Sequence, residues 1–183
     1  MRKNVHENNN PRLKGKALLI FGLLCFSFFL FGCTQKEIVV VNPTQSYGGM
    51  WGKSDSGFVV VDLVTPDVYV PITDLNSNYL QNFVFSDSNL VPSFDGVYLA
   101  SITTSMDSAN NGAYGMKLFV DDVGQNNCYA HRDFKVGDTG SFGFNCFVDL
   151  NAGQIVNVRL DDHANPVGDA TIYSFNITLS KIN

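Results

Sequence analysis

The chain has 183 residues, enough for one sizeable domain and too few for two. Phe (15 residues) and Gly (16) are abundant while charged residues make up only 16%, which favours a β-rich domain with many turns over a helical bundle or a disordered chain. Residues 1–32 hold five of the 12 basic residues and one acid, so the other 151 residues carry 7 basic and 16 acidic side chains. Their net charge of −9 makes nucleic acid and an anionic membrane surface poor partners.

An apolar segment near the N-terminus predicts export. The run at 17–32 follows the basic stretch and ends at Cys33, which is the pattern of a secretory signal with a small residue before the cleavage point. Its end, Leu30-Phe31-Gly32-Cys33, resembles the lipobox of bacterial lipoproteins, in which the Cys is lipidated and becomes the mature N-terminus. Phe31 departs from that pattern, because a small residue is usual at its position.

An uncleaved signal anchor at 17–32 is the alternative to lipidation. The run has 16 residues, which is short for a membrane span of about 20. Both alternatives predict an exported protein that is membrane-anchored at residues 1–33, with its body extracytoplasmic or at the cell surface.

Residues 34–57 are predicted to be a tether and a first turn. The short apolar run at 38–41 is stopped by Asn42 and Pro43, and the segment 47–52 is expected to be flexible and aromatic. That segment contains the only Trp, Trp51, which more often fills an open end of a sandwich than binds sugar.

The rest of the chain, 58–183, alternates apolar and polar residues between turn signals. No helical period is visible, and many short strands of this kind indicate a sandwich or barrel. Polar loops are expected at 73–79 and 161–169. Strands are expected at 58–64, 68–72, 80–85, 96–106, 114–120, 128–134, 141–150, 156–160 and 171–182.

Three motifs follow one another in the body: Gly-Val-Tyr at 96–98, Leu-x-x-Gly-x-x-Val-x-Val at 150–158 and Tyr-Ser-Phe-Asn-Ile-x-Leu at 173–179. In their order and spacing they resemble the globular head of complement component one q and the tumour necrosis factor (TNF) superfamily. That head has an Asp directly after the Gly of the second motif, where this chain has Gln154. The resemblance covers roughly 48–183, and a microbial or viral member of the superfamily would suit a lipobox.

The resemblance implies an all-β, two-sheet antiparallel jelly-roll sandwich. It also implies a homotrimer formed through one flat aromatic sheet, and binding without catalysis. It places the C-terminal strand centrally, beside the strand that begins at Tyr98. Tyr98, Tyr173 and Phe175 are accordingly expected in the core or on the trimer face. No collagen-like repeat is present, and the receptor and calcium sites of the superfamily lie in variable loops, so no residues are carried over from them.

The body has two cysteines, Cys128 and Cys146. Export favours a disulfide, and two buried free thiols are the alternative. If consecutive strands occupy opposite sheets, as the resemblance implies, these residues would meet across the sandwich. Sheets lie about 10 Å apart and a disulfide needs Cα atoms within about 7 Å, so a local pinch would be required.

Metal-binding candidates in the body are few. His131, His163 and Asp162 are a conceivable zinc set, but no paired ligand spacing supports it. The acid pairs Asp121–Asp122 and Asp161–Asp162 offer oxygen ligands for calcium, although such pairs are more often solvated acids in turns. We therefore expect no cofactor, with calcium as the weak alternative.

The sequence favours a binding or scaffolding protein over an enzyme. It contains no Gly-x-Ser-x-Gly motif, phosphate loop or dinucleotide fingerprint. The expected partners are other copies of the chain in a homotrimer, the membrane through the N-terminal lipid or anchor, and an unidentified protein or glycan ligand. The alternative is a carbohydrate-binding or glycan-active β-sandwich that uses Trp51 and loop acids.

Overall fold

The computed structural model describes residues 45–52, 57–164 and 166–182, which belong to one compact unit, Asn42–Asn183. The predicted export segment 17–32, the lipidation candidate Cys33 and the apolar run 38–41 lie outside the described residues. Within the described ranges, no helix is long and apolar enough to cross a membrane. The strands are β1 (Tyr47–Gly52), β2 (Val59–Val61), β3 (Val70–Pro71), β4 (Leu75–Gln81), β5 (Phe83–Ser86), β6 (Asn89–Pro92), β7 (Gly96–Ser108), β8 (Gly112–Val120), β9 (Val123–Phe134), β10 (Thr139–Leu150), β11 (Val156–Asp162) and β12 (Ala170–Lys181).

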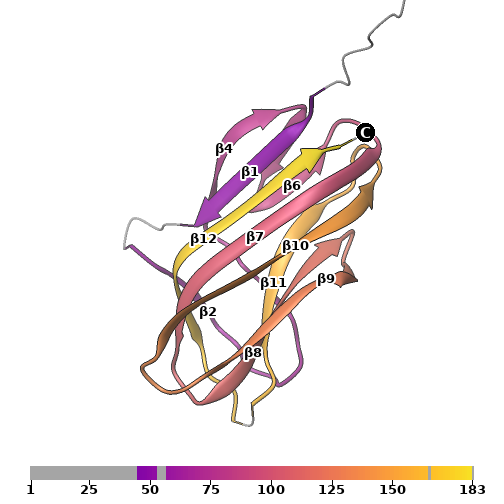
Figure 1. Ribbon diagram of the computed structural model, residues 1–183. Coiled ribbons are helices and arrows are strands. Elements are labelled where there is room, and N and C mark those ends of the chain that lie inside the picture. The colour runs from indigo at the N-terminus through magenta and orange to yellow at the C-terminus, as the bar shows by residue number, and fades with distance from the viewer. Residues whose placement is uncertain (1–44, 53–56, 165, 183) are drawn as a thin grey trace, which may run out of the picture. The chain divides into compact units, whose positions relative to one another are not determined.

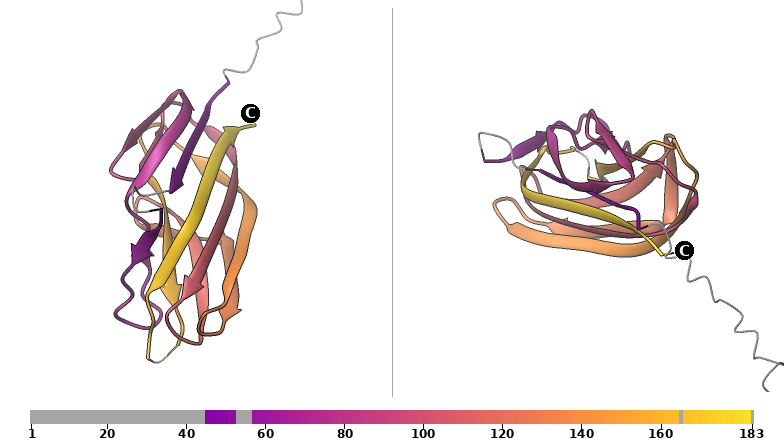
Figure 2. Two further views of the ribbon diagram at one scale, coloured as in Figure 1. Left: turned by 90° about the vertical axis from the view of Figure 1, so that its left-hand side faces the viewer. Right: turned by 90° about the horizontal axis from the view of Figure 1, so that it is seen from above.

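These strands form two antiparallel sheets that face each other as layers (Figure 2). One sheet has the order β10-β7-β12-β1-β4, with β2 paired to β12. The other has the order β5-β6-β11-β8-β9, with β3 paired to β11. From β6 onward the chain changes sheet at every connection except the β8–β9 hairpin, and β12 lies between β7 and β1 (Figure 1). The predicted all-β, two-sheet antiparallel sandwich is therefore confirmed.

The core fills the space between the sheets. The apolar alternation in 96–106 and 114–120 predicts one inward face for each strand, and this is confirmed, since Tyr98, Ile102 and Met116 are among the fully buried side chains. Burial of one such large apolar side chain contributes roughly 1.5–3 kcal/mol, so this interior supplies most of the favourable free energy of folding. The Tyr98 hydroxyl donates a hydrogen bond to the Phe94 carbonyl at 2.8 Å, which satisfies its one buried polar atom.

The apolar alternation in 171–182 predicts one shared face for Tyr173 and Phe175, and that prediction was wrong at Tyr173. A β-bulge shifts the register of β12 against β7 between Ile172 and Ser174, so Ile172 and Phe175 both point into the core. Tyr173 is 42% exposed instead, and its hydroxyl donates to Asp107 at 2.6 Å. Strict alternation does not survive an inserted residue, which is why the sequence pattern misplaced this side chain.

Two predicted irregular segments are strands. Residues 47–52, expected to be flexible, form β1 between β12 and β4, and the expected polar loop 73–79 contains most of β4. Gly48 obscured the first strand because glycine has a low strand propensity. A Cβ on Gly48 would lie 2.7 Å from the Phe83 ring, so the ring itself requires a glycine there.

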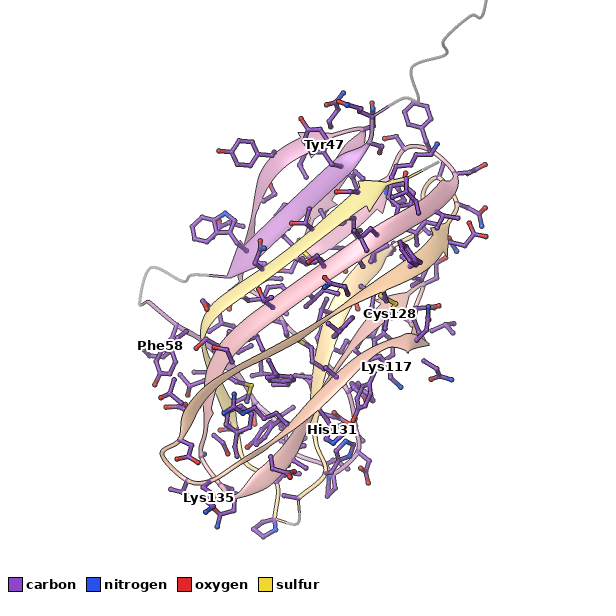
Figure 3. All side chains as sticks on the ribbon, viewed as in Figure 1. Tyr47, Phe58, Lys117, Cys128, His131 and Lys135 are labelled. Carbon is purple, nitrogen blue, oxygen red and sulfur yellow. A yellow bond between two sulfur atoms is a disulfide. The ribbon has the colours of Figure 1, made fainter. Side chains whose placement is uncertain are left out.

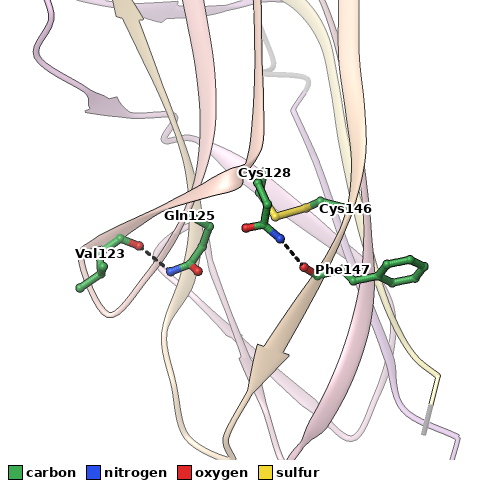
Figure 4. Close-up of a disulfide and its surroundings, with 6 residues drawn as sticks. Val123, Gln125, Cys128, Cys146 and Phe147 are labelled. Atoms are coloured by element: carbon green, nitrogen blue, oxygen red, sulfur yellow. Dashed lines mark hydrogen bonds between the residues drawn. A yellow bond between two sulfur atoms is a disulfide. The ribbon is translucent and has the colours of Figure 1, made fainter.

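A disulfide closes one side of the sandwich. The Cys128 and Cys146 sulfurs are 2.07 Å apart and their Cα atoms 5.3 Å apart (Figure 4). β9 and β10 are the edge strands of opposite sheets, so the bond joins the sheets at a margin where they approach each other. The Asn127 side-chain amide donates to the Phe147 carbonyl at 2.8 Å and joins the same two strands.

Replacing Cys128 and Cys146 together by Ala is expected to lower the free energy of unfolding by about 3 kcal/mol. The bond closes a loop with a sequence separation of 18 residues, and loops of about 15 residues give that magnitude. Urea denaturation of the oxidised protein and of the double variant measures the difference. Mass mapping after alkylation gives the check: free thiols at both positions in unreduced protein would contradict the bond.

Candidate functional site

A buried carboxylate lies near the end of β11. Asp161 is 0% exposed although it alternates with the core residue Leu160 and therefore belongs to the outer face of its sheet. Its neighbours come from the segment between β2 and β3, from β9 and from the chain just after β11. We call Asp67, Tyr69, Tyr129, Asp161 and His163 the Asp161 cluster.

Strand pairing places a glycine opposite this carboxylate. Asp161 is paired with Gly115 of β8, and a Cβ on that glycine would lie 2.2 Å from Asp161 Oδ1 and 3.0 Å from the Tyr129 ring. The missing side chain thus makes room for both the acid and the aromatic ring. Lys117 and His131, labelled in Figure 3, lie near each other on this same outer face.

Asp161 is poorly stabilised by its surroundings. Burial raises the pKa of its carboxyl, and the positive charge of His163 opposes that increase. The Tyr69 hydroxyl and the Gly115 amide also lower this pKa, but neither meets hydrogen-bond geometry, and no described residue donates a hydrogen bond to either carboxylate oxygen. An ionised carboxylate buried without donors costs several kcal/mol unless a cation compensates.

His163 lies between two carboxylates. Its Nδ1 contacts Asp67 Oδ1, while its Nε2 lies 3.6 Å from Asp161 Oδ2 and 3.3 Å from the Tyr129 hydroxyl. The hydrogen bond with Asp67 raises the pKa of His163, partial burial lowers it, and the charge of Asp161 raises it again. His163 is therefore the one cationic group of the cluster that faces Asp161 directly.

Lys117 is near the cluster without pairing with its acids. Its ammonium nitrogen lies 5.1 Å from the centre of the Tyr69 ring and 5.3 Å from that of Tyr129. The cation thus rests on aromatic faces. Burial raises the pKa of both tyrosines, and the negative charge of Asp161 raises each further. Both rings therefore stay neutral and cover the carboxylate.

The predicted picture of Asp161 and Asp162 as solvated acids in a turn was wrong. β11 extends through both residues, and both are fully buried. The Asp162 carboxylate accepts hydrogen bonds from the Ala164 amide at 2.8 Å and the Gly168 amide at 2.9 Å, so it closes the loop that leads to β12. Its role in this structure is to fix that loop.

The zinc set considered from the sequence is not assembled. Asp162 is engaged by the loop amides, and the His131 ring stacks on Tyr129 at 5.9 Å between centroids. His163 instead meets Asp67 and Asp161, whose ligand atoms all lie within 4.8 Å of one another and of a His163 nitrogen. Asp67 lies 96 positions away in sequence, and no local pattern connects it with His163.

The other calcium candidates, Asp121 and Asp122, form the tight turn of the β8–β9 hairpin. Their φ angles of 47° and 65° are those of a type I′ turn. Asp121 accepts hydrogen bonds from the Ile155 amide at 2.8 Å and the Gln154 side chain at 2.9 Å, and Asp122 pairs with Arg159. Both acids therefore have protein partners, and calcium there stays the alternative to the expected absence of a cofactor.

No protein-family model matches this chain, and no curated protein matches it. Among solved structures, Eiger TNF from S. frugiperda matches with a TM-score of 0.59 at 14% identity, covering 77% of this chain and 94% of that chain. Murine APRIL in a crystal structure at pH 5.0 matches with a TM-score of 0.53 at 10% identity, covering 75% of this chain and 99% of that chain. The chain has a TNF-like jelly-roll fold. At these identities the likeness concerns the fold alone.

The TNF-like jelly roll has a small aromatic pocket beside β1. The pocket has a volume of about 210 Å³ and includes Tyr47, Gly49, Trp51 and Tyr79 in its lining. Trp51 is half-buried, and its indole nitrogen is buried with no hydrogen-bond acceptor among the described residues. Aromatic side chains next to a glycine in the lining suit a flat apolar group.

The outer face of the β10-β7-β12-β1-β4 sheet departs from the flat aromatic surface that the resemblance implied. Its centre carries small hydroxyl and amide side chains, including a hydrogen bond of 2.7 Å from Ser101 to Asn145. Exposed aromatic residues include Phe147 on the edge strand β10 and Tyr47 on β1, which lies next to the edge strand β4. The small residues on this face are Gly49, Ser101, Thr103, Asn145, Asn176 and Thr178.

Proposed function

We propose that this protein is a surface-tethered binding or scaffolding protein whose TNF-like head assembles as a homotrimer. The observation that carries the proposal is the outer face of the β10-β7-β12-β1-β4 sheet, which has small polar side chains on its middle strands and exposed aromatic residues on either side of them. Small side chains permit close approach of a second chain, and the exposed aromatics supply apolar area. We expect no catalysis, because the sequence has no recognisable catalytic motif.

The two margins of this face differ, which suits a cyclic assembly. At the β10 margin Phe147 projects and is 59% exposed, whereas the opposite side, at β1 and the edge strand β4, is hollowed by the pocket at Trp51. A threefold ring joins unlike patches of successive protomers, whereas a twofold dimer joins like patches. A protruding ring on one side and a hollow on the other therefore favour the trimer.

Phe147→Glu is expected to convert the trimer to a monomer. The substitution places a charge in a desolvated contact without disturbing the core, because Phe147 is exposed within one chain. Val84→Glu is the matched control, since Val84 is 58% exposed on β5 of the opposite sheet. Light scattering measures both masses. A trimer that survives Phe147→Glu, or one that Val84→Glu also disrupts, would argue against this interface.

The tether in this proposal is a lipid on Cys33. Cys33→Ser should release the protein from membranes or leave an unprocessed precursor, because the thiol is the acylated group in a lipobox. Fractionation and electrophoretic mobility provide the measurement. Unchanged size together with unchanged membrane retention would support an uncleaved anchor instead.

Carbohydrate binding is the second candidate function, and the pocket at Trp51 is the observation that favours it. Stacking of a sugar ring on Trp51 would require the pocket to be open in the assembled protein. The trimer proposed above covers that margin of the sheet. Quenching of the single Trp by a glycan in the wild-type trimer would favour carbohydrate binding, since no other Trp contributes to the signal.

A further inference from the structure

We propose that Asp161 and His163 bind a divalent transition-metal ion of the zinc class, with Asp67 orienting the imidazole from behind. This site lies on the outer face of the β5-β6-β11-β8-β9 sheet, opposite the sheet proposed for the trimer. It depends neither on assembly nor on the tether, and a monomeric protein would leave the proposal intact.

The spacing of the ligand atoms suits zinc. Tetrahedral zinc sites have metal–ligand distances of about 2.0–2.2 Å, which puts neighbouring ligand atoms roughly 3.3–3.6 Å apart. His163 Nε2 and Asp161 Oδ2 are separated by 3.6 Å, which is the edge of such a tetrahedron. The Tyr129 hydroxyl lies 3.3 Å from the same nitrogen and borders a third position.

Asp67 contacts the imidazole nitrogen of His163 that would not bind the metal, which is a common arrangement at metal-binding histidines. A carboxylate that accepts the Nδ1 proton holds the imidazole in the tautomer whose Nε2 lone pair is free for a metal. Asp67 contacts His163 on Nδ1, which leaves Nε2 facing Asp161. The structure therefore presents an oriented nitrogen ligand and a carboxylate ligand side by side.

The buried carboxylate of Asp161 is the observation that indicates a bound cation. The Asp161 side chain is 1% exposed, and neither of its oxygens accepts a hydrogen bond from any residue in the described part of the chain. The missing side chain of Gly115 makes room for Asp161 Oδ1, which a Cβ there would approach to 2.2 Å. A carboxylate buried in this way is stabilised by a bound cation, and a protonated His163 is the competing source of positive charge.

The donor set distinguishes among metals. One imidazole nitrogen with carboxylate oxygen suits zinc and its neighbours in the first transition series. Calcium takes six to eight oxygen ligands and does not use imidazole as a rule. Two direct protein ligands leave the remaining positions to solvent, to the Tyr129 hydroxyl or to a partner's side chain.

The test uses the full-length protein, purified in detergent and stripped with a chelator. Added zinc should bind and raise the melting temperature by several degrees at concentrations well above the dissociation constant, because it stabilises only the folded state. Asp161→Asn and His163→Gln should each abolish this shift. Asp67→Asn should weaken zinc binding about 10–100-fold, as loss of an orienting carboxylate does. His131→Gln is the matched control and should leave the shift unchanged.

The variants also separate the competing explanations. Asp161→Asn removes a buried charge, so the metal-free variant should fold with a melting temperature no lower than that of the wild type. If it nevertheless fails to fold, His163→Gln alone decides, since that side chain is partly exposed. Four results would each overturn the proposal. They are an unchanged melting temperature with zinc, an equal shift of the melting temperature in the His163→Gln variant, loss of that shift in His131→Gln, and an equal response to calcium.

Discussion

Deletion of residues 175–183 is expected to leave no soluble folded protein, although short terminal deletions are usually tolerated. The deleted part of β12 lies between β7 and β1 in the middle of its sheet. It carries Phe175, Ile177 and Leu179, each at most 3% exposed. At roughly 1.5–3 kcal/mol each, their loss amounts to about 5–9 kcal/mol, which rivals the roughly 5–15 kcal/mol stability of a domain.

The deletion also uncovers two strand edges, which promotes aggregation. Soluble yield and thermal unfolding measure the effect. Removal of residues 182–183 alone is the control and should leave the fold intact, because β12 ends at Lys181. An unchanged melting curve after the nine-residue deletion would show that β12 is not a central strand.

Phe175→Ala is expected to lower the free energy of unfolding by about 3–5 kcal/mol, since it leaves a cavity in the core. Tyr173→Phe, two positions away, is expected to cost no more than about 1 kcal/mol, because it removes one exposed hydrogen bond to Asp107. Urea denaturation of the two variants measures the contrast. Losses of equal size would mean that the bulge in β12 is absent and that both side chains share one face.

The sequence predicted the regular strands because the alternation of apolar and polar residues can be seen within each strand alone. In 96–106 and 114–120 each core residue is two positions from the next, and the observed burial follows that period. The bulge at Ile172–Ser174 adds one residue to β12 relative to β7, and this depends on the pairing of two strands that are distant in sequence. β1 was missed for a similar reason, because Gly48 is required by the Phe83 ring of another strand.

Only part of the Asp161 cluster could be predicted from the sequence. Asp161 and His163 were both noted, but as members of different candidate sites. Their assembly depends on Asp67 and Tyr129, which strand pairing and loop packing bring from distant parts of the chain. Gly115 was the available signal, because a glycine in the middle of an apolar strand often marks a close approach of another group.

The outer face of the β10-β7-β12-β1-β4 sheet changes what a trimer of this chain would look like. The resemblance to the TNF superfamily implied an aromatic face, whereas the centre here is made of Ser, Thr and Asn side chains. An interface built on such residues would be hydrogen-bonded and hydrated, with its apolar contacts at the margins. Phe147 and Trp51 are therefore expected to contribute more to assembly than any central residue.

The number of chains per particle tests the proposed trimeric head most directly. Native mass spectrometry of the detergent-solubilised wild-type protein gives that number even if processing at the N-terminus changes the mass of each chain. We expect particles of three chains that persist on dilution into the micromolar range. A population consisting of single chains at the same concentrations would contradict the proposed trimeric head.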